Sequence, residues 1–276
     1  MSRDLLKLVS VVARLRRECP WDREQTPETI RTYVLEECYE VLEALDRGDP
    51  RALEGELGDL LFQILFLATL ASERGWFDLD ALCQTITRKM VDRHPHVFGD
   101  VPAKTAAEVK QGWERRKREQ TGSESDPLGS IPGTLPAAAA AYRMTSRAAD
   151  LGFDWERDAD VAAKIEEELG EWRTAFERAD PAAEAKEIGD LLLSVVNLAR
   201  RRRIDPEAAL RQTNARFRKR FAAVSRRAAA SGRPISDIPL AELDAYWEDS
   251  KKEERSALGS RPSARHGKKP KPRADR

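Results

Sequence analysis

Apolar residues recur along this chain at the three- and four-residue spacing of α-helices, and the alternating pattern of β-strands is scarce. Capping residues mark several helix ends, because Thr26 and Asp180 each precede a proline and Gly48 follows a long apolar-periodic stretch. The sequence therefore predicts an all-α protein. The predicted helices cover 3–17, 27–47, 51–74, 79–94 and 106–119 in the first half, and 135–150, 159–179, 182–203, 206–231 and 240–254 in the second.

Five acidic residues of the first half recur in the second half with the same internal spacing. The first set is Glu36, Glu37, Glu40, Glu56 and Asp59, and the second is Glu167, Glu168, Glu171, Glu187 and Asp190, each 131 residues after its counterpart. A pattern that keeps register over this distance indicates an internal repeat. The repeat continues past the acids with small length changes, since Arg93 corresponds to Arg220 and the pair Trp113 and Lys117 to Trp247 and Lys251.

The repeat predicts a tandem of two helical domains, residues 1–120 and 135–255. Residues 121–134 are rich in Gly, Ser and Pro and are expected to form the linker. Residues 256–276 are basic and poor in apolar side chains, so we expect a disordered tail. Such a tail could touch nucleic acid weakly, and a solubilising role explains it equally well.

Composition narrows the class of protein. The 276 residues carry 48 basic and 48 acidic side chains, so net charge does not favour a polyanion-binding protein. Three cysteines without CxxC spacing are typical of reduced thiols in the cytoplasm. The amphipathic N-terminus does not resemble a signal peptide, and the longest apolar stretches, 60–70 and 191–199, are short for a bilayer. We therefore expect a cytoplasmic protein without a membrane partner.

The acids predict a metal site in each half. Glu37 and Glu40 share one helical face, as do Glu56 and Asp59, and the short connection after Gly48 makes the two helices antiparallel neighbours. Four clustered carboxylates repel one another, and a divalent cation removes this conflict. Ligands that are all oxygen favour Mg²⁺, with Mn²⁺ as a substitute, and no histidine follows these acids as iron or zinc sites would require. A solvated acidic surface is the alternative, but it must account for paired motifs that occur twice in register.

Basic residues near the second set suggest a phosphate ligand. Lys164 shares a helical face with Glu168 and Glu171, and Lys186 adjoins Glu187. Cations beside carboxylates that hold a metal are expected where a polyphosphate bridges them. Ordinary ion pairing remains an alternative for Lys164, and Trp247 could stack on a base or pack in a core.

The motifs together resemble the MazG family of all-α nucleoside triphosphate pyrophosphohydrolases, in its tandem-repeat form. The resemblance rests on Glu-Glu-x-x-Glu followed by Glu-x-x-Asp, with supporting stretches at 19–22, 54–62, 93–98 and 152–155. It implies Mg²⁺-dependent hydrolysis of nucleoside triphosphates to monophosphates and pyrophosphate, broad base tolerance and an intertwined helical homodimer. It also implies metal ligands at Glu168, Glu171, Glu187 and Asp190, with Glu167 orienting or activating water, and nucleotide contacts at Lys164, Lys186, Arg216, Arg220, Trp247 and Lys251. Arg218 departs from the family pattern, which commonly has an acid there.

We expect turnover in the second repeat, with Glu167, Glu168 and Lys186 as the catalytic residues. The first repeat keeps the acids Glu37, Glu40, Glu56 and Asp59 as a less certain metal site, but it has Tyr33 in place of Lys164 and Gly55 in place of Lys186. Losing two charge-assisted contacts of about 1.5–3 kcal/mol each would weaken nucleotide binding roughly a hundredfold or more. A catalytically weak nucleotide sensor and a scaffold that binds metal and nucleotide are the alternative functions.

Overall fold

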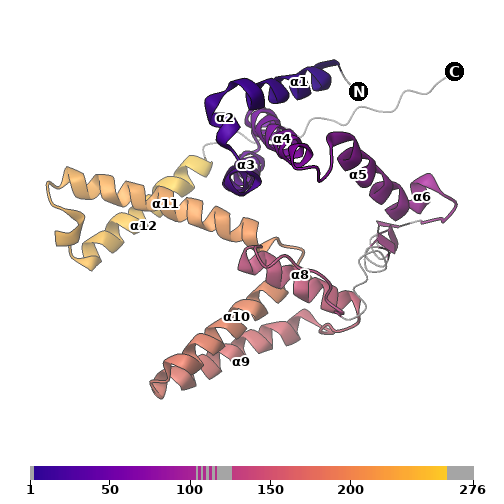
Figure 1. Cartoon of the computed structure of the whole chain (residues 1–276). Coiled ribbons are helices and arrows are strands. Elements are labelled where there is room, and N and C mark those ends of the chain that lie inside the picture. Colours follow the sequence, from indigo (N-terminus) through magenta and orange to yellow (C-terminus); the bar gives the residue numbers. More distant parts are fainter. Residues whose placement is uncertain are drawn as a thin grey trace, which may run out of the picture. The chain divides into compact units, whose positions relative to one another are not determined.

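The computed structural model describes residues 3–103, 105, 106, 108, 109, 112, 113, 116 and 126–259. All regular structure within these residues is helical, which confirms the predicted fold class (Figure 1). The chain divides into two compact units, Met1–Pro206 and Glu207–Arg276. This division falls inside the second predicted domain, whereas the repeat boundaries at 120 and 135 stay a prediction. Most of the predicted helix 106–119, Lys117 within it, and tail residues 260–276 lie outside the described part.

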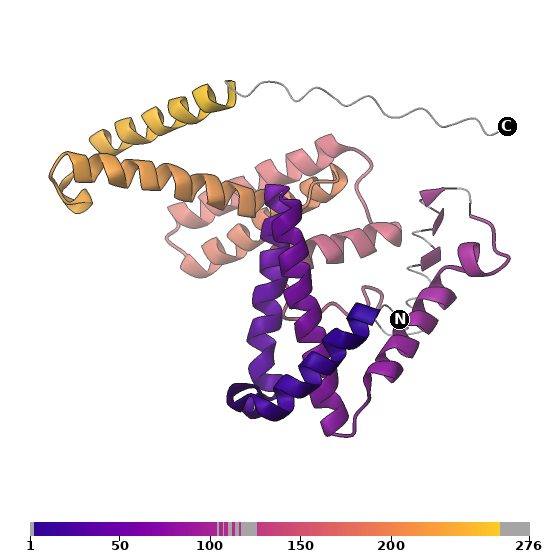
Figure 2. The same cartoon turned by 90° about the horizontal axis from the view of Figure 1, so that it is seen from above.

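The first repeat is built around the hairpin of α3 (Pro27–Arg47) and α4 (Pro50–Glu73). The two helices lie side by side and run antiparallel (Figure 2). Thr26 caps α3 with a reciprocal hydrogen bond to Thr29, and Asp49 accepts hydrogen bonds from the first backbone amides of α4. Gly48 ends α3 with a φ of 64°, a conformation that glycine adopts without strain.

Helices α1 (Arg3–Glu18) and α2 (Pro20–Glu24) precede this hairpin, and α5 (Leu79–Arg93) and α6 (Pro95–Phe98) follow it. Of these, α1 and α5 contact α4. The sequence predicted α1 and α5 but missed α2 and α6, because helices of five and four residues are too short to show a hydrophobic period.

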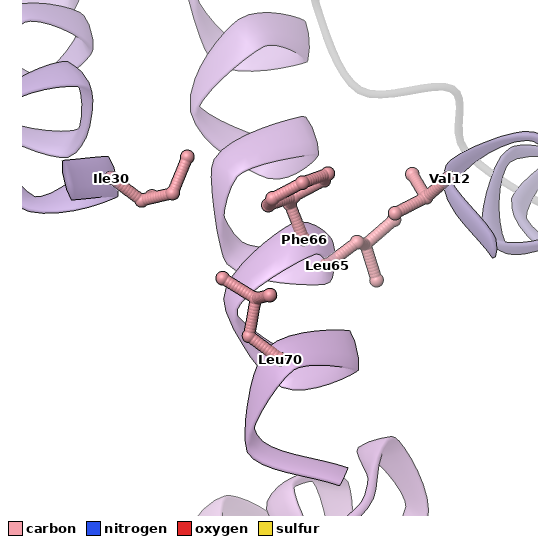
Figure 3. Close-up of a cluster of buried hydrophobic side chains, with 5 residues drawn as sticks. All are labelled: Val12, Ile30, Leu65, Phe66 and Leu70. Carbon is pink, nitrogen blue, oxygen red and sulfur yellow. The ribbon is translucent and has the colours of Figure 1, made fainter. Parts of the chain in front are cut away.

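The first-repeat core joins α1, α3 and α4. Val12, Ile30, Leu65, Phe66 and Leu70 are buried together, with Phe66 at the centre (Figure 3). Three of the five belong to α4, which explains its long apolar run. By length and composition α4 could also cross a membrane, a property that the core helices of soluble proteins share. The expectation that no segment meets a membrane stays a prediction.

The second repeat has the same central hairpin. Helix α9 (Asp158–Glu177) and α10 (Pro181–Arg201) each begin 131 residues after α3 and α4, and Asp180 caps α10 as Asp49 caps α4. Helix α8 (Ala137–Asp150) packs against α10. The structure therefore confirms the tandem arrangement of the two hairpins.

The second compact unit is a helical pair, α11 (Pro206–Ala230) and α12 (Leu240–Gly259), joined through the short helix η2 (Ile235–Asp237). Arg220 of α11 lies 2.7 Å from Glu254 of α12, and Arg227 lies 3.1 Å from Asp249. These ion pairs fix the register of the two helices. Helix α12 continues to Gly259, so residues 256–259 belong to a helix and not to the tail as predicted.

Candidate metal centre

Three acids of the second repeat gather between α9 and α10. Glu168 and Glu171 come from α9 and Glu187 from α10, and one carboxylate oxygen of each lies within 4.8 Å of the other two. We call these three residues the second-repeat cluster. They meet because i,i+3 spacing puts the two α9 acids on one face, and the capped turn at Asp180 brings α10 back along that face.

Two members of the second-repeat cluster are buried with unsatisfied oxygens. Glu168 is 5% exposed and Glu187 is 9% exposed. The Oε2 atom of each is buried and accepts no hydrogen bond from the described residues. Because a buried carboxylate oxygen without a partner is costly, the pair fits a bound cation. Burial is the largest cause that raises the pKa of Glu171, and the neighbouring Glu187 and Glu168 raise it further. The raised pKa is another sign of crowded negative charge.

The donor set decides which cation fits. All three side chains offer oxygen, which suits Mg²⁺ and Mn²⁺. The cluster is open on one side, since Glu171 is exposed. A dication held there keeps room for water or phosphate oxygens, the usual remaining ligands of Mg²⁺.

Two lysines flank the second-repeat cluster, as the sequence predicted. Lys164 Nζ lies 2.9 Å from Glu167 and 2.8 Å from Glu168, and Lys186 Nζ lies 2.9 Å from Glu187. Hydrogen bonds to these carboxylates raise the pKa of both lysines, so both carry a charge at neutral pH. The site thus combines clustered carboxylates with two cations that lie against them.

Asp190, a predicted metal ligand, lies outside the three-acid group. Its Oδ2 atom is 3.0 Å from Lys186 Nζ, one helical turn away. The role of Asp190 as a ligand stays a prediction, because the same i,i+4 spacing serves either the metal or the lysine.

The first repeat also forms a group of three acids, Glu37, Glu56 and Asp59, which we call the first-repeat cluster. One oxygen of each again lies within 4.8 Å of the others. Glu40, predicted as a fourth ligand, is exposed and outside this group. Burial raises the pKa of Glu37, as do Asp59, Glu40 and Glu56, while a hydrogen bond from Gln63 opposes the increase.

Two cations of the second repeat, Lys164 and Lys186, are replaced by uncharged residues at the corresponding positions of the first. Tyr33 stands at the position of Lys164 and packs against the first-repeat core, with its ring 5.7 Å edge-on from Trp21. Gly55 stands at the position of Lys186, and a Cβ atom added there would meet nothing within 4 Å. The first-repeat cluster therefore gathers three acids, like the second, but without the two lysines.

Four predicted nucleotide contacts lie in the second compact unit. The Arg220 guanidinium is 5.8 Å from the Trp247 ring, and Phe217 packs 5.2 Å from the same ring. Lys251 pairs with Glu248 at 2.6 Å, and Arg216 donates to Thr213 at 2.8 Å. Arg93 lies over Trp113 at 5.3 Å in the first repeat, so the arginine–tryptophan contact also recurs. A joint site of these residues with Lys164 and Lys186 stays a prediction.

The sequence did not identify a cavity beside the loop between α8 and α9. Its volume is about 310 Å³, and its lining is Thr145, Ala148, Gly152, Phe153, Asp154, Trp155 and Asn197. Asp154 ties the loop to α10 through Arg200 and Arg201. Burial would raise the pKa of Asp154, but hydrogen bonds from Arg200 and the Trp155 amide lower it overall. The sequence marks residues 152–155 of this loop only as a stretch that supports the family resemblance.

Known proteins share both repeats. The model of the MazG nucleotide pyrophosphohydrolase domain matches residues 25–98 and 158–225, which hold the two clusters. The nucleoside triphosphate pyrophosphohydrolase/pyrophosphatase MazG of Thermotoga maritima is 41% identical over 248 residues, 89% of this chain and 94% of the relative. A nucleoside triphosphate pyrophosphohydrolase of Escherichia coli K12 is 41% identical over 255 residues, 90% of this chain and 97% of the relative.

Proposed function

This chain belongs to the MazG nucleotide pyrophosphohydrolase family, and from that premise we propose that it hydrolyses nucleoside triphosphates to nucleoside monophosphates and pyrophosphate. The proposal includes Mg²⁺ dependence, broad base tolerance and a cytoplasmic location, where the nucleotide pool lies. One observation carries it: Glu168 and Glu187 each have a buried oxygen that accepts no hydrogen bond from the described residues, and both belong to one acidic group that two lysines flank.

The second-repeat cluster would hold the cation. Glu168, Glu171 and Glu187 supply oxygen ligands, and Asp190 joins them when Lys186 turns to the nucleotide. When bound, Mg²⁺ would supply Lewis-acid polarisation of the phosphate oxygens and a more acidic water. The burial of Glu168 and Glu187 fixes their side chains, so little ordering cost remains when the nucleotide arrives.

The remaining side chains would manage charge and water. Lys164 and Lys186 exchange their carboxylate partners for phosphate oxygens, because a triphosphate offers several charge-assisted acceptors. Lys186, with Arg216 and Arg220, neutralises charge on the departing pyrophosphate. Glu167 is exposed beside Lys164 and orients the water that attacks the α-phosphorus.

A homodimer is part of the proposal. Leu57, Leu61 and Ile64 form an exposed apolar stripe along α4, with helical spacing i, i+4 and i+7. The residues 131 positions later, Ile188, Leu192 and Val195, form the same exposed stripe along α10. Apolar stripes of this kind favour contact with a second copy. Light scattering on the wild type and Leu192→Glu tests this, and a wild-type monomer would contradict it.

The activity is tested by pyrophosphate release. Each common nucleoside triphosphate is supplied with Mg²⁺ to the wild type, to Glu168→Ala and to the matched first-repeat variant Glu37→Ala. We expect release by the wild type, loss of at least about a hundredfold in Glu168→Ala because a metal ligand is removed, and near wild-type release in Glu37→Ala. No release by the wild type would favour the nucleotide sensor or scaffold, and equal loss in both variants would contradict turnover in the second repeat alone.

A further inference from the structure

A buried glutamine adjoins the first-repeat cluster. Gln63 is 8% exposed, although it sits in the apolar stretch of α4. It follows Asp59 by one helical turn and Glu56 by two, so the three residues share one face of the helix. Its side chain also hydrogen-bonds Glu37 on α3. Gln63 therefore reaches the cluster from the side of the hydrophobic core.

The amide oxygen of Gln63 has no partner. The amide nitrogen is the group that can donate to Glu37, and Oε1 is buried without a hydrogen bond from any residue that the structure describes. Buried amide oxygens nearly always have a hydrogen-bond partner. The unsatisfied Oε1 atom of Gln63 therefore indicates that a ligand binds there. Hard dications take amide oxygens together with carboxylates.

The second repeat is built differently at the same position. Ser194 occupies the place of Gln63, and it is not among the buried polar side chains without a partner. The second-repeat cluster has Lys164 and Lys186 as counter-charges. Within the described ranges, no ion pair reaches Glu37, Glu56 or Asp59, so the first-repeat cluster has three carboxylates and one orphaned oxygen.

We propose that the first-repeat cluster binds one divalent cation, Mg²⁺ or Mn²⁺, through Glu37, Glu56, Asp59 and the amide oxygen of Gln63, and that it does so without a nucleotide. This inference goes beyond the proposed function, which needs only the second-repeat cluster. The cation links α3 to α4 beside the core that holds Leu65 and Phe66. Its binding therefore stabilises the α3–α4 hairpin and gives the first repeat a structural role.

The test isolates the first repeat by disabling the second. Mn²⁺ is titrated into the full chain carrying Glu168→Gln and Glu187→Gln, without nucleotide, and free Mn²⁺ is followed by electron paramagnetic resonance. We expect one ion per chain. Adding Gln63→Leu should lower the affinity about 10–100-fold, whereas the matched control Ser194→Ala should leave it unchanged.

A second variant separates a ligand from a packing residue. Gln63→Glu adds a charged oxygen to the ligand set, so Mn²⁺ affinity should rise while the metal-free protein melts at a lower temperature. A residue needed only for packing would lower both quantities. Absence of Mn²⁺ uptake, equal affinity in Gln63→Leu and its parent, or weaker binding in Gln63→Glu would overturn the proposal. Metal uptake is measured without turnover, so these outcomes leave the proposed hydrolysis untouched.

Discussion

In the second repeat, Lys164 and Lys186 neutralise the acids from both helices of the hairpin, whereas in the first repeat Tyr33 and Gly55 stand in their places. Each repeat brings three acids within 4.8 Å of one another, but Asp59 takes part in the first cluster, whereas Glu171 takes part in the second and Asp190, the counterpart of Asp59, does not. The same helical hairpin thus places its acids beside lysines in the second repeat and beside uncharged residues in the first. A triphosphate needs cations around the metal, and only the second repeat supplies them from α9 and α10.

The exchange of Lys164 for Tyr33 also changes stability. Tyr33 packs on the first-repeat core and against Trp21, so its ring is used for burial where the lysine is used for charge. Gln63 adds to this difference, because it places at a buried position an amide oxygen that accepts no hydrogen bond from the described residues. The first repeat thus has an acidic cluster without the two lysines that lie beside the second-repeat cluster.

Removing both second-repeat lysines should abolish most of the difference in nucleotide affinity between the repeats. In the variant Lys164→Met/Lys186→Met we expect nucleotide affinity to fall roughly a hundredfold or more, since two charge-assisted contacts of about 1.5–3 kcal/mol each are lost. Calorimetric titration with a non-hydrolysable triphosphate and Mg²⁺ measures this. Unchanged affinity would mean that these lysines serve only as partners of the acids.

The reverse change, adding a lysine to the first repeat, should give that repeat some of the nucleotide affinity of the second. Gly55→Lys places a lysine one residue before Glu56, as Lys186 precedes Glu187, and the structure has space for it. In the Lys164→Met/Lys186→Met background we expect nucleotide affinity to increase about tenfold, from one new contact of about 1.5 kcal/mol. Gly55→Gln is the uncharged control. If lysine and glutamine behave alike, charge is not what distinguishes the repeats.

Two glycines of the first repeat should respond in opposite directions. Gly55 lies inside α4 and a methyl group there meets nothing, so Gly55→Ala should increase the free energy of unfolding by about 0.5–1 kcal/mol. Gly48 has a φ of 64°, so Gly48→Ala should decrease it by about 1–2 kcal/mol. Urea unfolding monitored by circular dichroism measures both. A destabilising Gly55→Ala would indicate that a neighbour occupies this space.

The smallest expected effect is on the pH dependence of the metal-free protein. The pKa of Glu37 is raised above its ordinary value of 4.5 by burial and then by Asp59 and Glu40. The folded state therefore binds the proton more tightly than the unfolded state, and the unfavourable contribution at pH 7 disappears as the pH falls through the raised pKa. Glu37→Gln should be more stable than the wild type at pH 7 and lose this advantage toward pH 4.5. A constant difference between the two proteins would contradict this.

The long helices and the convergence of the acids could be predicted because capping residues and the spacing of Glu37, Glu56 and their counterparts are local features. The burial of these acids could not be predicted, because it depends on packing between helices. The same packing leaves the Oε2 atoms of Glu168 and Glu187 without a hydrogen bond from the described residues. Gln63 did leave a signal, a polar residue within an apolar run, but its role needs the position of Glu37 across the hairpin.

We expect both clusters to hold metal but only the second to hold a nucleotide. The most direct measurement is the stoichiometry of Mn²⁺ and of a non-hydrolysable triphosphate on the full-length chain at saturation. We predict at least one Mn²⁺ at each cluster and one nucleotide per chain, with the nucleotide lost and one Mn²⁺ retained in Glu168→Gln/Glu187→Gln. Two nucleotides per chain, or a nucleotide retained by that variant, would contradict it.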